Sequence, residues 1–320
     1  MIVSFLDLLG FSQLLRNKYD VAIQCLNHFN DIIYTKKVDE KHDPKNGSLE
    51  LSDEFFIISS LSKIQYMISI SDSLIMGGKN EDCSYFVKQI SYFLGQCYIR
   101  STESMCSAYL RKESGNDFEN EQMSKQDDSF PILFRGGIDI GTEKNFFLEN
   151  SILNQELKGT SLNVTGLTYL NAVILEEKSP LKGPRLFCTK RVVESLDEET
   201  KKIVRKCGQC EEIGEFYEIV WTVISCEVLQ KSSDSNENVR RAINKTLLPA
   251  AIQLYRCNKE KPDKIRKQYE ELVKLICMGI LKYASSHESE KYDKFLREIQ
   301  EKIQETGIEI DGTIIEDFIK

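Results

Sequence analysis

An α/β (α+β) fold is predicted by the order in which strand-like and helical patterns alternate along this chain of 320 residues. Short apolar runs are typical of strands, and apolar residues three or four positions apart are typical of helices. The segments are a strand at 2–6, a helix at 12–34, strands at 63–70 and 73–76, a helix at 81–111 and a strand at 131–141. This order, βαββαβ, is that of a ferredoxin-like core.

Each element has its own signal. The residues that mark the two helices are Leu15, Ala22 and Leu26 in the first and Phe86, Ile90 and Phe93 in the second. Their spacing brings the apolar side chains of each helix onto one face. Only Ser71 and Asp72 separate the strands at 63–70 and 73–76, which predicts a tight hairpin with Asp72 at its tip.

The rest of the chain adds strands and then only helices. A hairpin partner for the strand at 131–141 is expected at 145–148. The later elements are a helix at 166–177, a strand at 185–188, helical stretches at 190–196 and 199–205, a strand at 216–223, and helices at 237–257, 263–285 and 290–305. Two domains are expected, at 1–230 and 236–320. The polar stretches at 36–54 and 112–130 are expected to be a loop and a mobile insertion.

The composition excludes several classes of protein. A net charge of −8 and a pI near 5.2 argue against duplex nucleic acid as a partner, because phosphate backbones require a basic surface. No apolar run reaches the roughly 20 residues of a membrane span, and no secretory leader precedes the first strand. The ten cysteines are scattered, and the pair Cys207 and Cys210 is a weak zinc signal by spacing alone. A reduced, cytoplasmic protein is expected.

Two aspartates stand where apolar segments end or turn. Asp7 follows the apolar run at 2–6, and Asp72 lies at the predicted hairpin tip. Taken singly, Asp7 is explained as a helix N-cap and Asp72 as a turn residue. A carboxylate at the end of a buried strand needs a partner for its charge, however, and two such carboxylates favour a cation. Oxygen ligands beside a Gly10 turn that opens a helix predict Mg²⁺ or Mn²⁺ holding a nucleoside triphosphate.

Four short motifs occur in a fixed order within about residues 1–225. They are the strand-Asp7-x-x-Gly10-Phe11-helix start, the Ser71-Asp72-Ser73 hairpin, the strand Arg135-Gly-Gly-Ile-Asp-Ile-Gly141, and the helix that runs from Gly166 through Ala172 to Leu175-Glu176. Together they resemble the catalytic domain of class III nucleotidyl cyclases. The last two motifs are most similar to the pyrimidine (uridylate or cytidylate) cyclases of bacterial Pycsar antiphage systems.

This resemblance implies a metal site and a reaction. The two aspartates and the backbone carbonyl of Leu8 would hold two Mg²⁺ or Mn²⁺ ions, one acting on the ribose 3′-hydroxyl and the other on the triphosphate. The backbone amides of Leu9, Gly10 and Phe11 would bind the β- and γ-phosphates. The 3′-oxygen would attack the α-phosphorus of its own nucleotide, with pyrophosphate as the leaving group.

The groups that would stabilise the transition state remain open. Class III purine cyclases place an Asn and an Arg on the helix after the glycine, where this chain has Leu170 and Ile174. Asn171 is one residue off register, about 100° away on a helix. Either Arg135 or Arg185 replaces these groups, or the domain is catalytically impaired. Arg135 itself either reaches the phosphates or forms a surface ion pair of little energetic value.

The residues that would read the base also depart from the purine pattern. Purine cyclases usually carry a Lys or Glu four residues before the second aspartate, where this chain has Ile68. An apolar side chain offers no hydrogen bond to a purine edge. Asn163 stands three residues before the helix glycine and can both donate and accept, which suits uracil or cytosine alike, although a turn-forming role explains it equally well.

The leading hypothesis is a pyrimidine nucleotide cyclase that converts UTP or CTP to a 3′,5′-cyclic monophosphate; UTP is slightly favoured as the substrate because nothing in the sequence marks cytosine. The resemblance implies a homodimer with sites between the chains, and a separate effector that binds the cyclic nucleotide in antiphage defence. A purine cyclase with an unusual base pocket is the first alternative. The second is a degenerate cyclase fold that acts as a nucleotide sensor or scaffold.

Overall fold

The computed structural model describes residues 1–34, 63–113, 131–142, 147–151, 160–228, 233–309 and 318. The predicted loop at 36–54 lies outside these residues, as do positions 114–130 of the predicted insertion.

A seven-stranded sheet has the strand order β2-β3-β1-β4-β7-β9-β8. Its strands are β1 (Ile2–Leu8), β2 (Tyr66–Ile70), β3 (Ser73–Gly78), β4 (Phe134–Ile140), β7 (Leu186–Thr189), β8 (Val204–Cys210) and β9 (Gly214–Ile219). Strand β1 lies between β3 and β4 and is antiparallel to both, and β2 pairs with β3. This is the antiparallel order of the predicted ferredoxin-like core, so the predicted fold class is confirmed. The parallel pairing of β4 with β7 extends the sheet.

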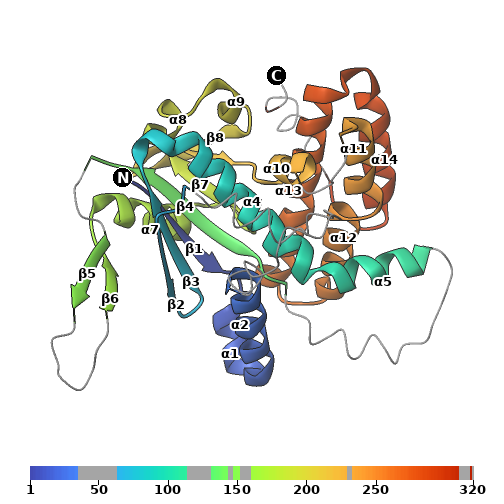
Figure 1. Cartoon of the computed structure of the whole chain (residues 1–320). Coiled ribbons are helices and arrows are strands. Elements are labelled where there is room, and N and C mark those ends of the chain that lie inside the picture. Colours follow the sequence, from blue (N-terminus) through green and yellow to red (C-terminus); the bar gives the residue numbers. More distant parts are fainter. Residues whose placement is uncertain are drawn as a thin grey trace, which may run out of the picture.

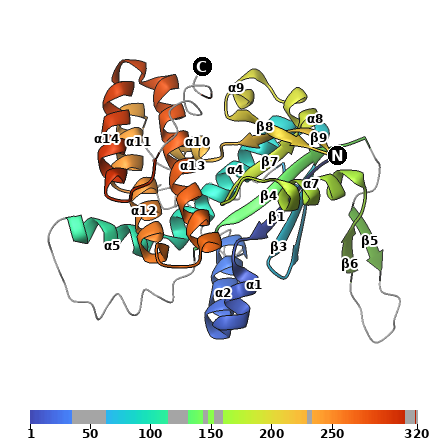
Figure 2. The same ribbon diagram turned by 180° about the vertical axis from the view of Figure 1, so that it is seen from behind.

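Helices cover both faces of this sheet (Figures 1 and 2). Helix α4 (Cys83–Ser101) packs on the face that carries Leu6, and α7 (Leu167–Lys178) packs on the other. Phe5 points to α7, where its ring centroid lies 6.2 Å from that of Tyr169. Because side chains alternate along a strand, Asp7 lies on the same face as Phe5.

Three predicted helices are each divided in the structure. The segments are α1 (Phe11–Asn17) and α2 (Tyr19–Tyr34), α4 and α5 (Glu103–Glu113), and α11 (Ser235–Asn244) and α12 (Leu247–Asn258). At the second break the Ser101 and Thr102 hydroxyls donate to carbonyls of the preceding turn, which competes with regular helix geometry. Pro249 explains the third break, because it has no N–H to continue the hydrogen bonds across the junction.

The remaining helices gather on one side of the molecule, in orange and red in Figure 1. They are α10 (Thr222–Val228), α13 (Asp263–His287) and α14 (Tyr292–Gln304), which lie with α11 and α12. Short helices α8 (Lys190–Glu194), α9 (Glu198–Lys201), η3 (Asn80–Asp82) and η4 (Ser289–Lys291) complete the helical elements of the described residues. Phe93 of α4, Trp221 and Leu272 of α13 belong to one hydrophobic core, so the C-terminal helices pack directly against α4; the division into two domains stays a prediction. None of the helices in the described ranges is long and apolar enough to cross a membrane.

Three details of the predicted elements differ in the structure. Strand β5 (Phe147–Ser151) pairs with β6 (Thr160–Val164) in a separate two-stranded sheet and not with β4. Residues 204–210 form β8, where a helix was expected to reach 205. The strand expected to reach 223 ends at Ile219. Polar side chains dominate β8, an edge strand with an irregular register, so its sequence lacks the apolar run that marks a strand.

Candidate functional site

The end of β1 and the tip of the β2–β3 hairpin bring Asp7 and Asp72 together. Asp7 is paired in the ladder with Ser73, and the Leu8 N–H donates to the Asp72 carbonyl over 3.0 Å. Ser71 has a φ of 55°, a left-handed conformation that lets the two-residue turn close tightly. The predicted juxtaposition of two carboxylates therefore follows from the register of β1 with β3.

Burial raises the pKa of Asp7, and the nearby negative charge of Asp72 raises it further. A hydrogen bond from Ser73 Oγ to Asp7 Oδ1, 2.9 Å long, acts in the opposite direction. Ser12 Oγ lies 3.5 Å from Asp72 Oδ2. Within the described residues no Lys or Arg forms an ion pair with either aspartate. Two adjacent carboxylates without a basic partner have the charge and the oxygen donors that a divalent cation needs.

The turn after Asp7 contains a left-handed glycine, and one of its three backbone amides already donates a hydrogen bond within the protein. Gly10 adopts φ 80° and ψ 0° and precedes α1. The Leu9 N–H donates to the Leu133 carbonyl over 2.8 Å, so this amide is bound within the protein. The predicted phosphate-binding roles of Leu9, Gly10 and Phe11 stay predictions, with only the last two amides open within the described chain.

Arg135 lies opposite Asp7 in the pairing of β1 with β4, and its guanidinium points to the end of α7. Its Nε donates to the Glu176 carbonyl and its Nη2 to the Ser179 carbonyl, each over 2.9 Å, while its Nη1 donates to Leu181. Its exposed fraction is 6%, and its guanidinium lies 5.2 Å from the centroid of the Phe187 ring. A surface ion pair is therefore excluded. The role of Arg135 toward phosphates stays a prediction.

Glu176 is a candidate that the sequence reasoning missed. Its Oε1 lies 3.3 Å from Arg135 Nε. Burial and the negative charge of Asp7 raise the pKa of Glu176 to about 7, against the positive charge of Arg135. The third carboxylate thus borders the acidic pair. Its sequence signal was its place at the end of the motif that runs from Gly166 to Leu175-Glu176, on the helix that covers the site.

Asn171 has a different partner from the one its sequence position suggests. Its Nδ2 donates to Asp139 Oδ2 over 2.8 Å, and Arg191 Nη2 lies 2.6 Å from the same oxygen. Thr189 Oγ1 donates to Asp139 Oδ1 over 2.6 Å. This fully buried aspartate thereby joins β4, α7, β7 and α8, and Asn171 serves the packing of α7.

Of the two predicted base-reading residues, the structure describes the side chain of Ile68 but not that of Asn163. Ile68 lies in β2 and packs with Val3 and Ile75 on the α7 face of the sheet. Asn163 lies in β6 opposite Leu148, and its side chain is outside the described structure. Leu170 is exposed on α7, so an apolar side chain stands where purine cyclases have their Asn.

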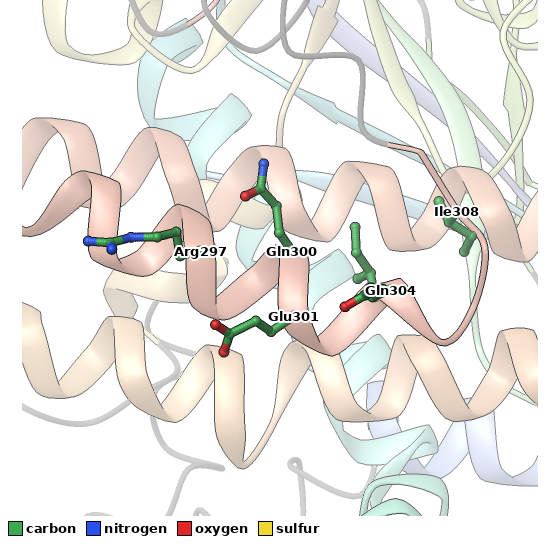
Figure 3. Close-up of a pocket in the computed structure, with 6 residues that line it drawn as sticks. Arg297, Gln300, Glu301, Gln304 and Ile308 are labelled. Atoms are coloured by element: carbon green, nitrogen blue, oxygen red, sulfur yellow. The ribbon is translucent and has the colours of Figure 1, made fainter.

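Two surface hollows lie elsewhere. One, of about 380 Å³, is lined by side chains of α14 and by Ile308. Figure 3 shows that Gln300 and Glu301 point to different sides of the helix and do not converge on one point. A second, of about 560 Å³, lies between α11 and α14 and has lining charges of both signs. In the described residues no group of three or more His, Cys, Asp or Glu side chains is arranged to hold a metal, so a site at Asp7 and Asp72 would also need backbone or substrate oxygens.

The chain is similar to three solved structures of cyclases. Two are structures of a bacterial light-regulated adenylyl cyclase, each 15% identical to this chain. The first has a TM-score of 0.43 and covers 75% of this chain and 55% of its own. The second has a TM-score of 0.41 and covers 72% of this chain and 96% of its own. The third is of adenylate cyclases from Trypanosoma brucei in their monomeric state, at 14% identity and a TM-score of 0.38 over 68% of this chain and 86% of that one. This chain thus spans about half the length of the first. No family model and no curated protein matches the chain.

Proposed function

We propose that this chain is a nucleotidyl cyclase that converts UTP or CTP to the 3′,5′-cyclic monophosphate. The observation that carries the proposal is the pair Asp7 and Asp72, held together by the β1–β3 register with no basic partner in the described residues. An acidic pair that repels itself lowers the stability of the folded chain, which is the expected signature of a site that needs a cation.

Asp7, Asp72 and the Leu8 carbonyl would hold Mg²⁺ or Mn²⁺ in this proposal. Such ions, when bound, neutralise the triphosphate and lower the pKa of the ribose 3′-hydroxyl. Ser73 fixes one oxygen of Asp7 and leaves the other for a ligand. In the reaction the 3′-oxygen bonds to the α-phosphorus, the bond to the pyrophosphate oxygen breaks, and the hydroxyl proton is released.

The α7 face of the sheet supports a pyrimidine as the base. Ile68 packs there among Val3, Ile75 and Tyr169, so the side chain at this position offers no hydrogen bond to a purine edge. The product would be a second messenger for a separate effector, and a homodimer and an antiphage role are the further parts of this proposal.

One observation favours a second candidate function, a nucleotide sensor without catalysis. Asn171 is bound to Asp139, and Leu170 occupies the position of the usual ribose-orienting Asn. Neither is then available to the transition state.

Product analysis separates these candidates. The purified chain is incubated with each of the four ribonucleoside triphosphates and Mn²⁺ or Mg²⁺, and the products are separated by mass. A cyclic pyrimidine monophosphate that is lost in Asp72→Ala and in Asp7→Asn, and kept in the exposed control Asp20→Asn, is the expected result. A cyclic purine product would correct the base, and nucleotide binding without any product would favour the sensor.

A further inference from the structure

The segment at 179–185, which joins α7 to β7, is held by side chains from several elements. Its backbone carbonyls accept from Arg135 at Ser179 and Leu181, from Arg185 Nε at Lys182 over 2.7 Å, and from Trp221 Nε1 at Pro184 over 2.8 Å. We call this segment the strap. Since Arg135 and Trp221 come from outside the segment and are almost fully buried, they fix the strap to the interior of the protein.

The strap also lies directly against α13, the long helix of the C-terminal module. Gly183 has a φ of 88°, and a Cβ added to it would stand 2.9 Å from the Cβ of Glu271. The Glu271 carboxylate forms an ion pair with Arg185 Nη2. At this contact the helix and the strap have no room for even one additional carbon atom.

Arg185 connects this helix to the sheet through a buried charge cluster. Its Nη1 pairs with Glu218 of β9, whose exposed fraction is 0%, and Glu218 also receives Arg205 Nη2 at 2.6 Å. Arg185 and Arg205 thus face two glutamates, and one of the two, Glu271, comes from α13, where it also pairs with Lys274 Nζ at 3.1 Å. Loss of this charge leaves a buried guanidinium with one partner too few.

From Arg185 the connection continues to the acidic end of β1. The Arg185 carbonyl accepts the Gly136 N–H over 2.9 Å, at the start of the β4–β7 pairing. The preceding residue, Arg135, is the ladder partner of Asp7 and holds the other end of the strap. An unbroken series of direct contacts therefore runs from α13 to the strand position of Asp7.

We propose that Glu271 is a positioning residue for the acidic site, acting through Arg185 and the strap. This inference depends on the proposed metal site at Asp7 and Asp72. It assigns to the C-terminal helices the task of fixing where α7 and β4 lie relative to β1.

Trp221, the one tryptophan of the chain, bonds to the strap and so reports on it directly. The full-length chain is titrated with Mn²⁺ alone, and bound Mn²⁺ is followed by electron paramagnetic resonance and Trp221 by emission and acrylamide quenching. In Glu271→Gln we expect about threefold to tenfold weaker Mn²⁺ binding and faster quenching of Trp221. Glu305→Gln, in the exposed pair with Arg256, is the matched control and should bind as the unmodified chain does.

Glu271→Asp keeps the charge and shortens the side chain, so a smaller loss in the same direction is expected; it serves also if Glu271→Gln does not fold. Unchanged Mn²⁺ affinity and unchanged quenching in both variants would overturn the inference. If Asp7→Asn binds Mn²⁺ as tightly as the unmodified chain, the proposed metal site itself is wrong, and the positioning role is refuted with it. Weaker binding in Asp7→Asn together with normal binding in Glu271→Gln refutes the positioning role alone.

Discussion

Gly137 is the point of closest approach between β4 and the helix that covers the site. A Cβ added there would lie 2.7 Å from the Cβ of Leu175 and closer still to the Ala172 carbonyl oxygen. Both atoms belong to the body of α7, so relief requires movement of the helix and not of one side-chain end. Such overpacking costs about 3 kcal/mol at its upper range. A Gly to Ala change also restricts the unfolded chain, which returns about 0.7 kcal/mol.

We therefore expect Gly137→Ala to lower the free energy of unfolding by about 2 kcal/mol. The matched control is Gly208→Ala on β8, where the added carbon would meet only the edge of the Phe216 ring, at 3.3 Å. Urea unfolding followed by Trp221 fluorescence measures both variants. Equal stability of Gly137→Ala and Gly208→Ala would refute the reasoning that α7 is packed against the Gly137 backbone without spare room.

Three further predictions concern charged groups of the site. Arg135→Met leaves the Glu176 carboxylate and three carbonyls without their donor, so urea unfolding should show a loss of about 3 kcal/mol or more; a loss below about 1 kcal/mol would mean that the guanidinium is not committed to α7. Asp7→Asn removes a buried charge that Asp72 repels, so the free energy of unfolding of the metal-free chain should rise by about 1 kcal/mol. A lower free energy of unfolding would mean that a positively charged group of the protein already compensates the Asp7 charge. Because the folded-state pKa of Glu176, about 7, lies above its ordinary 4.5, the folded chain holds a proton that the unfolded chain releases between these values. The stability that this group contributes is therefore full below about pH 4.5 and is lost as the pH rises to about 7. Between about pH 4.5 and 7 the free energy of unfolding should therefore fall less steeply in Glu176→Gln than in the unmodified chain. The exposed Glu177→Gln is the control, and equal slopes in Glu176→Gln and the unmodified chain would contradict the raised pKa of Glu176.

The sequence by itself determined the ferredoxin-like core and the approach of Asp7 to Asp72. The signals are an apolar strand that ends at Asp7 and a hairpin with two residues between its strands, whose turn fixes the register of β2 with β3. The register of β1 with β3, a pairing between distant parts of the chain, then places Ser73 opposite Asp7. The sequence also predicted the Gly10 turn that opens a helix, and the structure shows that this glycine adopts the αL conformation.

Other features were decided by contacts between residues far apart in the chain. Asn171 donates to Asp139 because α8, β4 and α7 meet at this aspartate, and the spacing of residues along one helix cannot predict such a contact. The edge strand β8 forms because β9 offers it hydrogen bonds, although its own side chains are polar. The burial of Arg135 was also decided by tertiary contacts: its sequence neighbours allowed a surface ion pair, and the guanidinium is buried against the carbonyls that end α7. Burial of a charge depends on which elements meet around it, and that is fixed only when the whole chain folds.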